Sequence, residues 1–226
     1  MTKYLFNQSL GKTVDAVNEA YFFGRTIPKS ERVNVAKWIA NRQGLPNSYA
    51  NMFAPTEKDL KEGVVLFTGE KIGSLVATRH ILGEEACRAL ILLDVHSAEV
   101  NKALKRASEG IRKKLSEHWA DGIYCCGSCT VALWRHLTVG GLDKSDNFID
   151  QGIKALKKHR YGKGRWRRFP FYYTLLVLNE LEDKHAYEEI HYASKVCERL
   201  LNRKTKENNT SQRRQILLQK VLEKIS

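Results

Sequence analysis

The side chains best suited to chemistry lie in a short basic segment in the second half of the chain. Eight Lys and Arg residues fall between positions 154 and 168 with no acidic residue among them, and the aromatic residues Tyr161 and Trp166 are interspersed, with Phe169 directly after. Basic groups neutralise phosphates, flat rings stack on bases, and glycines let a backbone approach closely. The pattern therefore predicts contact with a polyanion. The candidate residues are Arg160, Lys163, Arg165, Trp166, Arg167 and Arg168.

The same segment also has a purely structural interpretation. Residues 154, 157 and 158 have the spacing of a solvent-exposed helix face, and the aromatic residues could anchor a turn in the core. That interpretation does not explain Arg165, Arg167 and Arg168, which stand where a turn should enter the next helix. In the binding interpretation these arginines supply charge, and Trp166 stacks on the ligand or anchors the turn.

Two Arg-His pairs, Arg79-His80 and Arg135-His136, fall inside apolar segments that should be buried helices. Arg135 could line a concave face and bind a carboxylate or phosphate with two hydrogen bonds. Alternatively, each arginine pairs with a buried acid such as Glu84 or Glu180, because long charged side chains stay buried only when they are paired. We retain Arg135 as a candidate anion-binding residue.

Tyr172 and Tyr173 follow two phenylalanines at the start of another apolar segment. Such a cluster could line a cavity for an apolar ligand or form part of the core. Both tyrosines are candidate site residues.

The cysteines do not form a recognisable metal site. Cys126 and Cys129 form a Cys-x-x-Cys motif, but no second such motif and no His-x-x-x-His completes a tetrahedral set. Close helix packing by small residues is the competing explanation, and we expect neither a metal nor a cofactor. The chain also lacks a P-loop, a Rossmann glycine pattern and a His-Glu-x-x-His motif. No catalytic residue is identified, so the question of enzymatic activity stays open.

The elements that would position these residues are helices. Only four prolines occur, helix formers recur with a period near 3.6, and the one short strand candidate is 64–68. Segments starting at Ser74, Thr130 and Thr174 share one apolar pattern, and a weaker copy starts at Thr13. Amphipathic helices alternate with them. A single hairpin cannot bury its apolar face, whereas a stack of hairpins can.

The repeat predicts an all-α fold, an α/α superhelix of about four helical hairpins plus a C-terminal helix near 211–226. We expect a single domain, 1–226, with an inserted loop at 45–69 that contains a short helix at 56–62. Breaks are expected at residues 24–28, Gly83, 140–141 and 182–183. The break at Gly83 would make 84–93 an additional helix. The segments starting at Ser74, Thr130 and Thr174 should occupy equivalent buried positions.

The stretches CCGSCTVALWRHL (125–137) and GKGRWRRFPFYYTLLVLNEL (162–181) resemble the repeats of terpenoid cyclases and protein prenyltransferases. The resemblance implies an α/α toroid, here a partial one because about four hairpins fit instead of six. It also implies a polyprenyl diphosphate as ligand, bound in an aromatic cavity with an acid such as Asp121 or Glu70 at its mouth. The catalytic motifs of the family are missing: Gly127 and Tyr173 stand at two zinc-ligand positions, and no Asp-rich motif exists.

The charge of the chain favours an anionic partner. The net charge is +13, and residues 95–226 contain 26 basic and 15 acidic side chains, net +11. Such a field attracts nucleic acid, phosphorylated ligands or anionic surfaces. The leading hypothesis is a helical-repeat protein whose basic half binds an anionic partner, nucleic acid being the favoured polyanion. Alternatives are a polyprenyl or phosphorylated ligand, or a homodimer formed through an open edge of the array. Without an apolar run of membrane length or a secretory signal, we expect a cytoplasmic protein.

Overall fold

The computed structural model describes residues 3–119, 121–143, 145–204 and 206–226. Over these residues the chain forms ten helices and no strand, which confirms the all-α prediction. None of these helices is both long and apolar enough to cross a membrane. The helices are α1 (Leu10–Phe22), α2 (Lys29–Ala40), α3 (Glu57–Glu62), α4 (Leu75–Leu93), α5 (Ala98–His118), α6 (Gly127–Leu137), α7 (Ser145–Lys158), α8 (Phe171–Glu180), α9 (Lys184–Leu201) and α10 (Asn209–Glu223).

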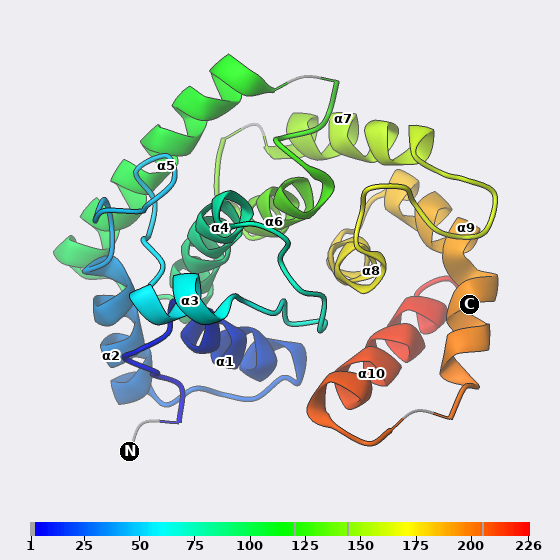
Figure 1. Ribbon diagram of the computed structural model, residues 1–226, viewed down its shortest axis with the longest axis horizontal. Helices are drawn as coiled ribbons and strands as arrows, with labels where there is room; N and C mark the ends of the chain where they lie inside the picture. The colour runs from blue at the N-terminus through cyan, green and yellow to red at the C-terminus, as the bar shows by residue number, and fades with distance from the viewer. Residues whose placement is uncertain (1–2, 120, 144, 205) are drawn as a thin grey trace.

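The helices form an inner and an outer set. The inner helices α1, α4, α6 and α8 pack on one another in chain order, and α2, α5, α7 and α9 lie outside them (Figure 1). The outer helices α5, α7 and α9 are strongly amphipathic, because each turns one apolar face towards the inner set. Inner helix α6 is buried along almost its whole length, as expected for a helix that neighbours cover on several sides.

A threonine marks the same position in each inner helix. Thr13, Thr78, Thr130 and Thr174 are all buried, and each hydroxyl donates to the carbonyl four residues earlier, at distances of 2.6 to 3.0 Å. Those carbonyls belong to the residues just before α1, α4, α6 and α8. The predicted equivalence therefore holds for the segments starting at residues 130 and 174. It is wrong for Ser74, an exposed N-cap, because the true equivalent is Thr78, one turn further on.

The predicted break at Gly83 is also wrong, because α4 is a single helix from Leu75 to Leu93. A Cβ atom at Gly83 would lie 2.6 Å from the Met52 Cε atom. The glycine therefore makes room for a side chain of the 45–69 insertion and does not end the helix.

The insertion at 45–69 covers one end of the inner set and is fixed by polar contacts. The predicted short helix is confirmed as α3, with Thr56 and Asp59 forming a capping box. The Asp59 carboxylate also accepts hydrogen bonds from the Ser9 hydroxyl (2.6 Å) and the Leu10 amide (2.8 Å), which caps α1. The strand predicted at 64–68 is replaced by one isolated bridge between Val65 and Lys71.

The last helix meets the first. Arg213 of α10 forms ion pairs with Asp15 and Glu19 of α1, and α10 also packs on α8 and α9 (Figure 1). The closing helix predicted near 211–226 is thereby confirmed. The partial toroid, the single domain and self-association through an open edge stay predictions.

Gly110 provides a test of how tightly the insertion packs on α5. A Cβ atom at this position would lie 1.8 Å from the Ala50 carbonyl oxygen. Alanine is favoured over glycine in a helix by about 1 kcal/mol, but here the backbone of the insertion would have to move. We expect Gly110→Ala to lower the free energy of unfolding by about 1 to 3 kcal/mol, measured by urea denaturation. A gain in stability would show that the insertion is free to shift.

Candidate functional site

Arg135 lies at the centre of the inner helices, with its side chain only 2% exposed. Its guanidinium binds the Glu85 carboxylate and donates two further hydrogen bonds to Glu180, at 3.2 and 3.0 Å. The structural interpretation is therefore correct for this residue, whereas Glu84 pairs instead with His136 at 2.7 Å. Arg135 is thus paired with acids of the core, and it also lines a cavity of about 270 Å³ together with Arg88 and Glu180. The other pair differs, since Arg79 is only partly buried.

The charged cluster around Arg135 lies between the inner helices, and on one side it borders this cavity of about 270 Å³, which Arg88, Arg135 and Glu180 help to line. Arg88 donates to Glu180 at 2.9 Å, Asn18 donates to Glu85 at 2.8 Å, and the Tyr173 hydroxyl donates to Glu85. Tyr173 is fully buried and leaves a cavity of only about 20 Å³ beside it. The prediction of Tyr173 as a ligand-contact residue is thus wrong, because its hydroxyl completes the cluster and its ring belongs to the core.

The basic segment forms a turn that α9 holds in place. The buried carboxylate of Glu189 accepts hydrogen bonds from the Trp166 indole (2.7 Å) and from two nitrogens of Arg160 (2.8 and 3.0 Å). The Tyr192 hydroxyl accepts from the Gly162 amide and donates to the Arg165 carbonyl. Trp166 is only 4% exposed, so the ring anchors the turn and does not form a stacking platform.

This anchoring directs the remaining cations of the turn outwards. Lys163, Arg167 and Arg168 are exposed, and none of them forms an ion pair with a described residue. Arg168 has a positive φ of 67°, which is unusual for a residue with a side chain. Arg165 is half-buried, and its guanidinium lies over the Phe171 ring at 4.3 Å. The turn thus presents three unpaired cations to solvent.

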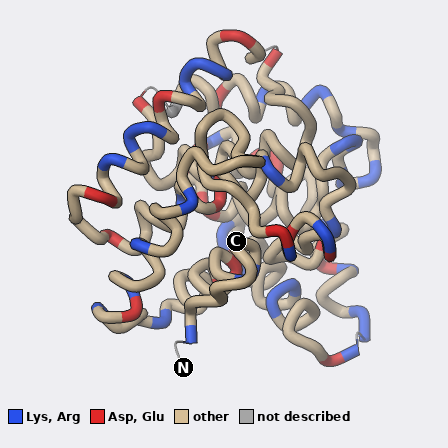
Figure 2. The backbone as a smooth tube through the Cα atoms, turned by 60° about the vertical axis from the view of Figure 1, so that its left-hand side comes forward, with Lys and Arg blue, Asp and Glu red and all other residues tan. Residues whose placement is uncertain are grey.

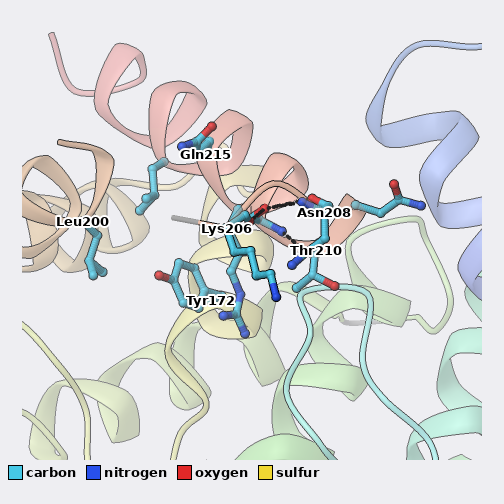
Figure 3. A pocket seen from close by; sticks show the side chains of 10 residues that line it. Tyr172, Leu200, Lys206, Asn208, Thr210 and Gln215 are labelled. Carbon is cyan, nitrogen blue, oxygen red and sulfur yellow. Dashed lines mark hydrogen bonds between the residues drawn. The ribbon is translucent and has the colours of Figure 1, made fainter. Parts of the chain in front are cut away.

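A cleft of about 660 Å³ opens beside α8, α9 and the first turn of α10. The side chains of Tyr172, Lys206 and Thr210 lie next to one another along it (Figure 3). The start of α10 is closed by a capping box between Asn208 and Ser211, and the amino end of a helix carries a partial positive charge. Other lining residues are Leu200, Asn209, Arg214, Gln215 and Leu218.

Tyr172 is the predicted aromatic candidate that does face a cleft. It is half-buried, and the Arg214 guanidinium lies 4.2 Å from its ring centroid. Burial raises the pKa of the Tyr172 phenol, which keeps it uncharged at neutral pH. Glu70 accepts hydrogen bonds from the Tyr172 and Tyr173 amides at 2.9 and 3.1 Å, so this acid caps the start of α8. The Glu70 Oε2 atom also lies 4.0 Å from the Arg214 Nη2 atom.

The turn and the cleft are neighbours through a row of stacked groups. Arg165 covers Phe171, whose ring centroid is 5.3 Å from that of Tyr172, and Tyr172 in turn contacts Arg214. This row connects the turn to the cleft, where Lys206 also has no ion pair within the described part of the chain. We call the set Lys163, Arg167, Arg168, Tyr172, Lys206 and Arg214 the basic cleft.

Sequence reasoning missed the contribution of α10 to this site. Lys206 and Arg214 belong to a basic run at 203–214, but they are separated from the turn by the whole of α9. Figure 2 shows that Lys and Arg also lie at many other places on the outside of the molecule, with acidic residues between them. Charge alone therefore does not locate the site. The cleft, together with the cations that have no ion pair with a described residue, locates it.

Comparison with models of known protein families, with curated proteins and with solved structures gave no match.

Proposed function

We propose that this protein binds an anionic partner in the basic cleft, and that the partner is single-stranded nucleic acid. The observation that carries the proposal is a set of cations without ion pairs, Lys206 in a cleft that contains a half-buried tyrosine, and Lys163, Arg167 and Arg168 on the turn that Arg165, Phe171 and Tyr172 connect to this cleft. Cations on a protein surface gain little from neighbouring acids, but cations along a groove gain free energy when they displace counterions from a phosphate backbone.

A single strand suits this arrangement better than a small phosphorylated compound. Cations are present on the turn at 163–168 and in the cleft itself, at Lys206 and Arg214, which provides contacts for more than one phosphate. Tyr172 and the aliphatic residues Leu200 and Leu218 provide an apolar surface for a base. Stacking on such a surface tolerates any sequence, because every base has a flat face. We therefore expect binding with little sequence preference.

The cyclase-like alternative, a polyprenyl diphosphate between the inner helices, has less support. The cavity next to Tyr173 is about 20 Å³, and the cavity of about 270 Å³ beside Arg135 is lined in part by the charged residues Arg88, Arg135, Glu180 and Lys220. A long apolar chain needs a cavity of several hundred Å³.

The test is a titration of the protein against a fluorescein-labelled single-stranded oligonucleotide, followed by anisotropy at several potassium chloride concentrations. We expect the logarithm of the association constant to fall linearly with the logarithm of the salt concentration, with a slope of roughly −2 to −4 for three to five phosphate contacts. Affinity that is independent of salt would contradict the proposal. Equal competition by free pyrophosphate would instead indicate a small phosphorylated ligand.

A further inference from the structure

A second group of chemically competent side chains lies far from the basic cleft in the sequence. His80 of α4, Cys125 just before α6 and Cys129 in its first turn each place a potential ligand atom within 4.8 Å of the other two. Among the described residues, no other group of three or more His, Cys, Asp or Glu side chains is this close in a form that suits a metal ion. The long α4 helix supplies the histidine, and Cys129 is the one cysteine of the Cys126–Cys129 motif that belongs to the group.

His80 has unused hydrogen-bonding capacity. Its side chain is fully buried, and neither ring nitrogen has a hydrogen-bond partner in the described structure. The nearest carboxylate oxygen, on Glu84, is 3.7 Å away from Nε2, too far for a hydrogen bond. Buried polar groups without partners are rare and costly. An unpartnered imidazole next to two thiols is explained if one nitrogen is a metal ligand.

Two tyrosines hold the His80 ring in place. The ring stacks on Tyr49 with a centroid distance of 4.3 Å and meets the edge of Tyr124 at the same distance. The two tyrosine hydroxyls are hydrogen-bonded to each other at 3.0 Å, so neither of them is directed to the imidazole nitrogens.

The thiols are close enough to act together. Cys125 lies directly before the N-cap of α6 and Cys129 in its first turn, where the helix dipole favours a thiolate. Metal binding would require both thiols to ionise, with release of protons.

We infer that His80, Cys125 and Cys129 bind a zinc ion and leave its fourth coordination position to water. A tetrahedral ion with Zn–S distances of about 2.3 Å and Zn–N distances of about 2.1 Å keeps its ligand atoms roughly 3.5 to 3.8 Å apart. The observed spread of up to 4.8 Å requires only small side-chain movements. Because Cys125 is exposed, solvent reaches this side of the site. Two thiolates and one imidazole with an open position are a set that zinc accepts.

The experiment is a cobalt titration of the reduced, chelator-treated full-length protein, followed by visible absorption. We expect one equivalent of cobalt with the intense ligand-field bands of tetrahedral thiolate coordination, and loss of these bands when zinc is added. His80→Asn and Cys125→Ser should abolish the bands. Cys197→Ser, which changes a buried thiol outside the group, should retain them.

Circular dichroism establishes that each variant is folded, and Cys125→Ser keeps the test decisive if His80→Asn is not. A wild-type protein that binds no cobalt would overturn the inference. So would a folded His80→Asn or Cys125→Ser protein with an unchanged cobalt spectrum.

Discussion

Arg135→Met is expected to lower the free energy of unfolding by about 3 to 5 kcal/mol. The substitution keeps the apolar length of the side chain but leaves Glu85, which is 5% exposed, and the partly exposed Glu180 without their central partner. Only Arg88 still faces Glu180 as a cation. A buried carboxylate without a compensating charge is far more costly than the net gain from an intact pair. Urea denaturation at pH 7 measures the change.

The loss in free energy of unfolding caused by Arg135→Met should also depend on pH. Burial raises the pKa of Glu85, but the charges of Arg135 and Arg88 outweigh burial and lower it. In the wild-type protein, Glu85 therefore contributes stability above its unfolded-state pKa, near 4.3, and this is lost as the pH falls through the lower folded-state pKa. Removing Arg135 raises the folded-state pKa. The difference between variant and wild type should shrink from pH 7 to pH 4.

Arg112→Met is the matched control for this prediction. Arg112 also pairs with an acid, Asp143, at 2.9 Å, but both side chains are largely exposed. We expect a loss of less than about 1 kcal/mol and no comparable pH dependence. Equal losses for Arg135→Met and Arg112→Met would show that the cluster around Arg135 is not a buried, charge-balanced unit.

The second large effect is expected from removing cations of the basic cleft. The triple variant Lys163→Ala, Arg167→Ala, Lys206→Ala should bind a single-stranded oligonucleotide on the order of tenfold more weakly or worse. It should also reduce the slope of the logarithm of the association constant against the logarithm of the salt concentration by roughly 2, about 0.7 for each lost phosphate contact. These exposed residues form no ion pairs with described residues, so stability should stay within about 0.5 kcal/mol of wild type.

A second triple variant separates a defined site from general attraction. Lys102, Lys105 and Arg106 are exposed on α5 and form no ion pair within the described residues. Replacing all three by alanine removes the same net charge. We expect a small loss of affinity and an almost unchanged salt slope. Similar effects of the two triple variants would mean that the basic protein attracts nucleic acid over its whole surface.

The repeat could be recognised in the sequence because its cause is local. In each inner helix a threonine of the first turn donates its hydroxyl back to the carbonyl four residues earlier, at Thr13, Thr78, Thr130 and Thr174. The alignment of Ser74 with Thr130 and Thr174 is wrong because serine resembles threonine in type. The expected break at Gly83 is wrong because a glycine is commonly a helix breaker. Whether a glycine breaks a helix or makes room depends on a neighbour, here Met52. That neighbour is distant in sequence.

The site residues were harder to predict for the same reason. The sequence pattern around Arg160 and Trp166 is typical of a binding segment. In the structure both side chains instead donate hydrogen bonds to Glu189 on α9. Lys206 and Arg214 belong to the basic cleft only because α10 returns to α8. His80 is distant in sequence from the thiols of Cys125 and Cys129, and only the packing of α4 places it beside them. Each of these outcomes depends on contacts between helices that periodicity does not encode.

If the anionic partner binds in the basic cleft, a bound single strand should protect the backbone of this region. Hydrogen–deuterium exchange with and without a saturating single-stranded oligonucleotide measures this protection. We expect slower exchange of backbone amides in peptides covering residues 160–172 and 206–215, and unchanged exchange in α5. Protection confined to α5, or tight binding with no protection of either cleft segment, would contradict binding in the basic cleft.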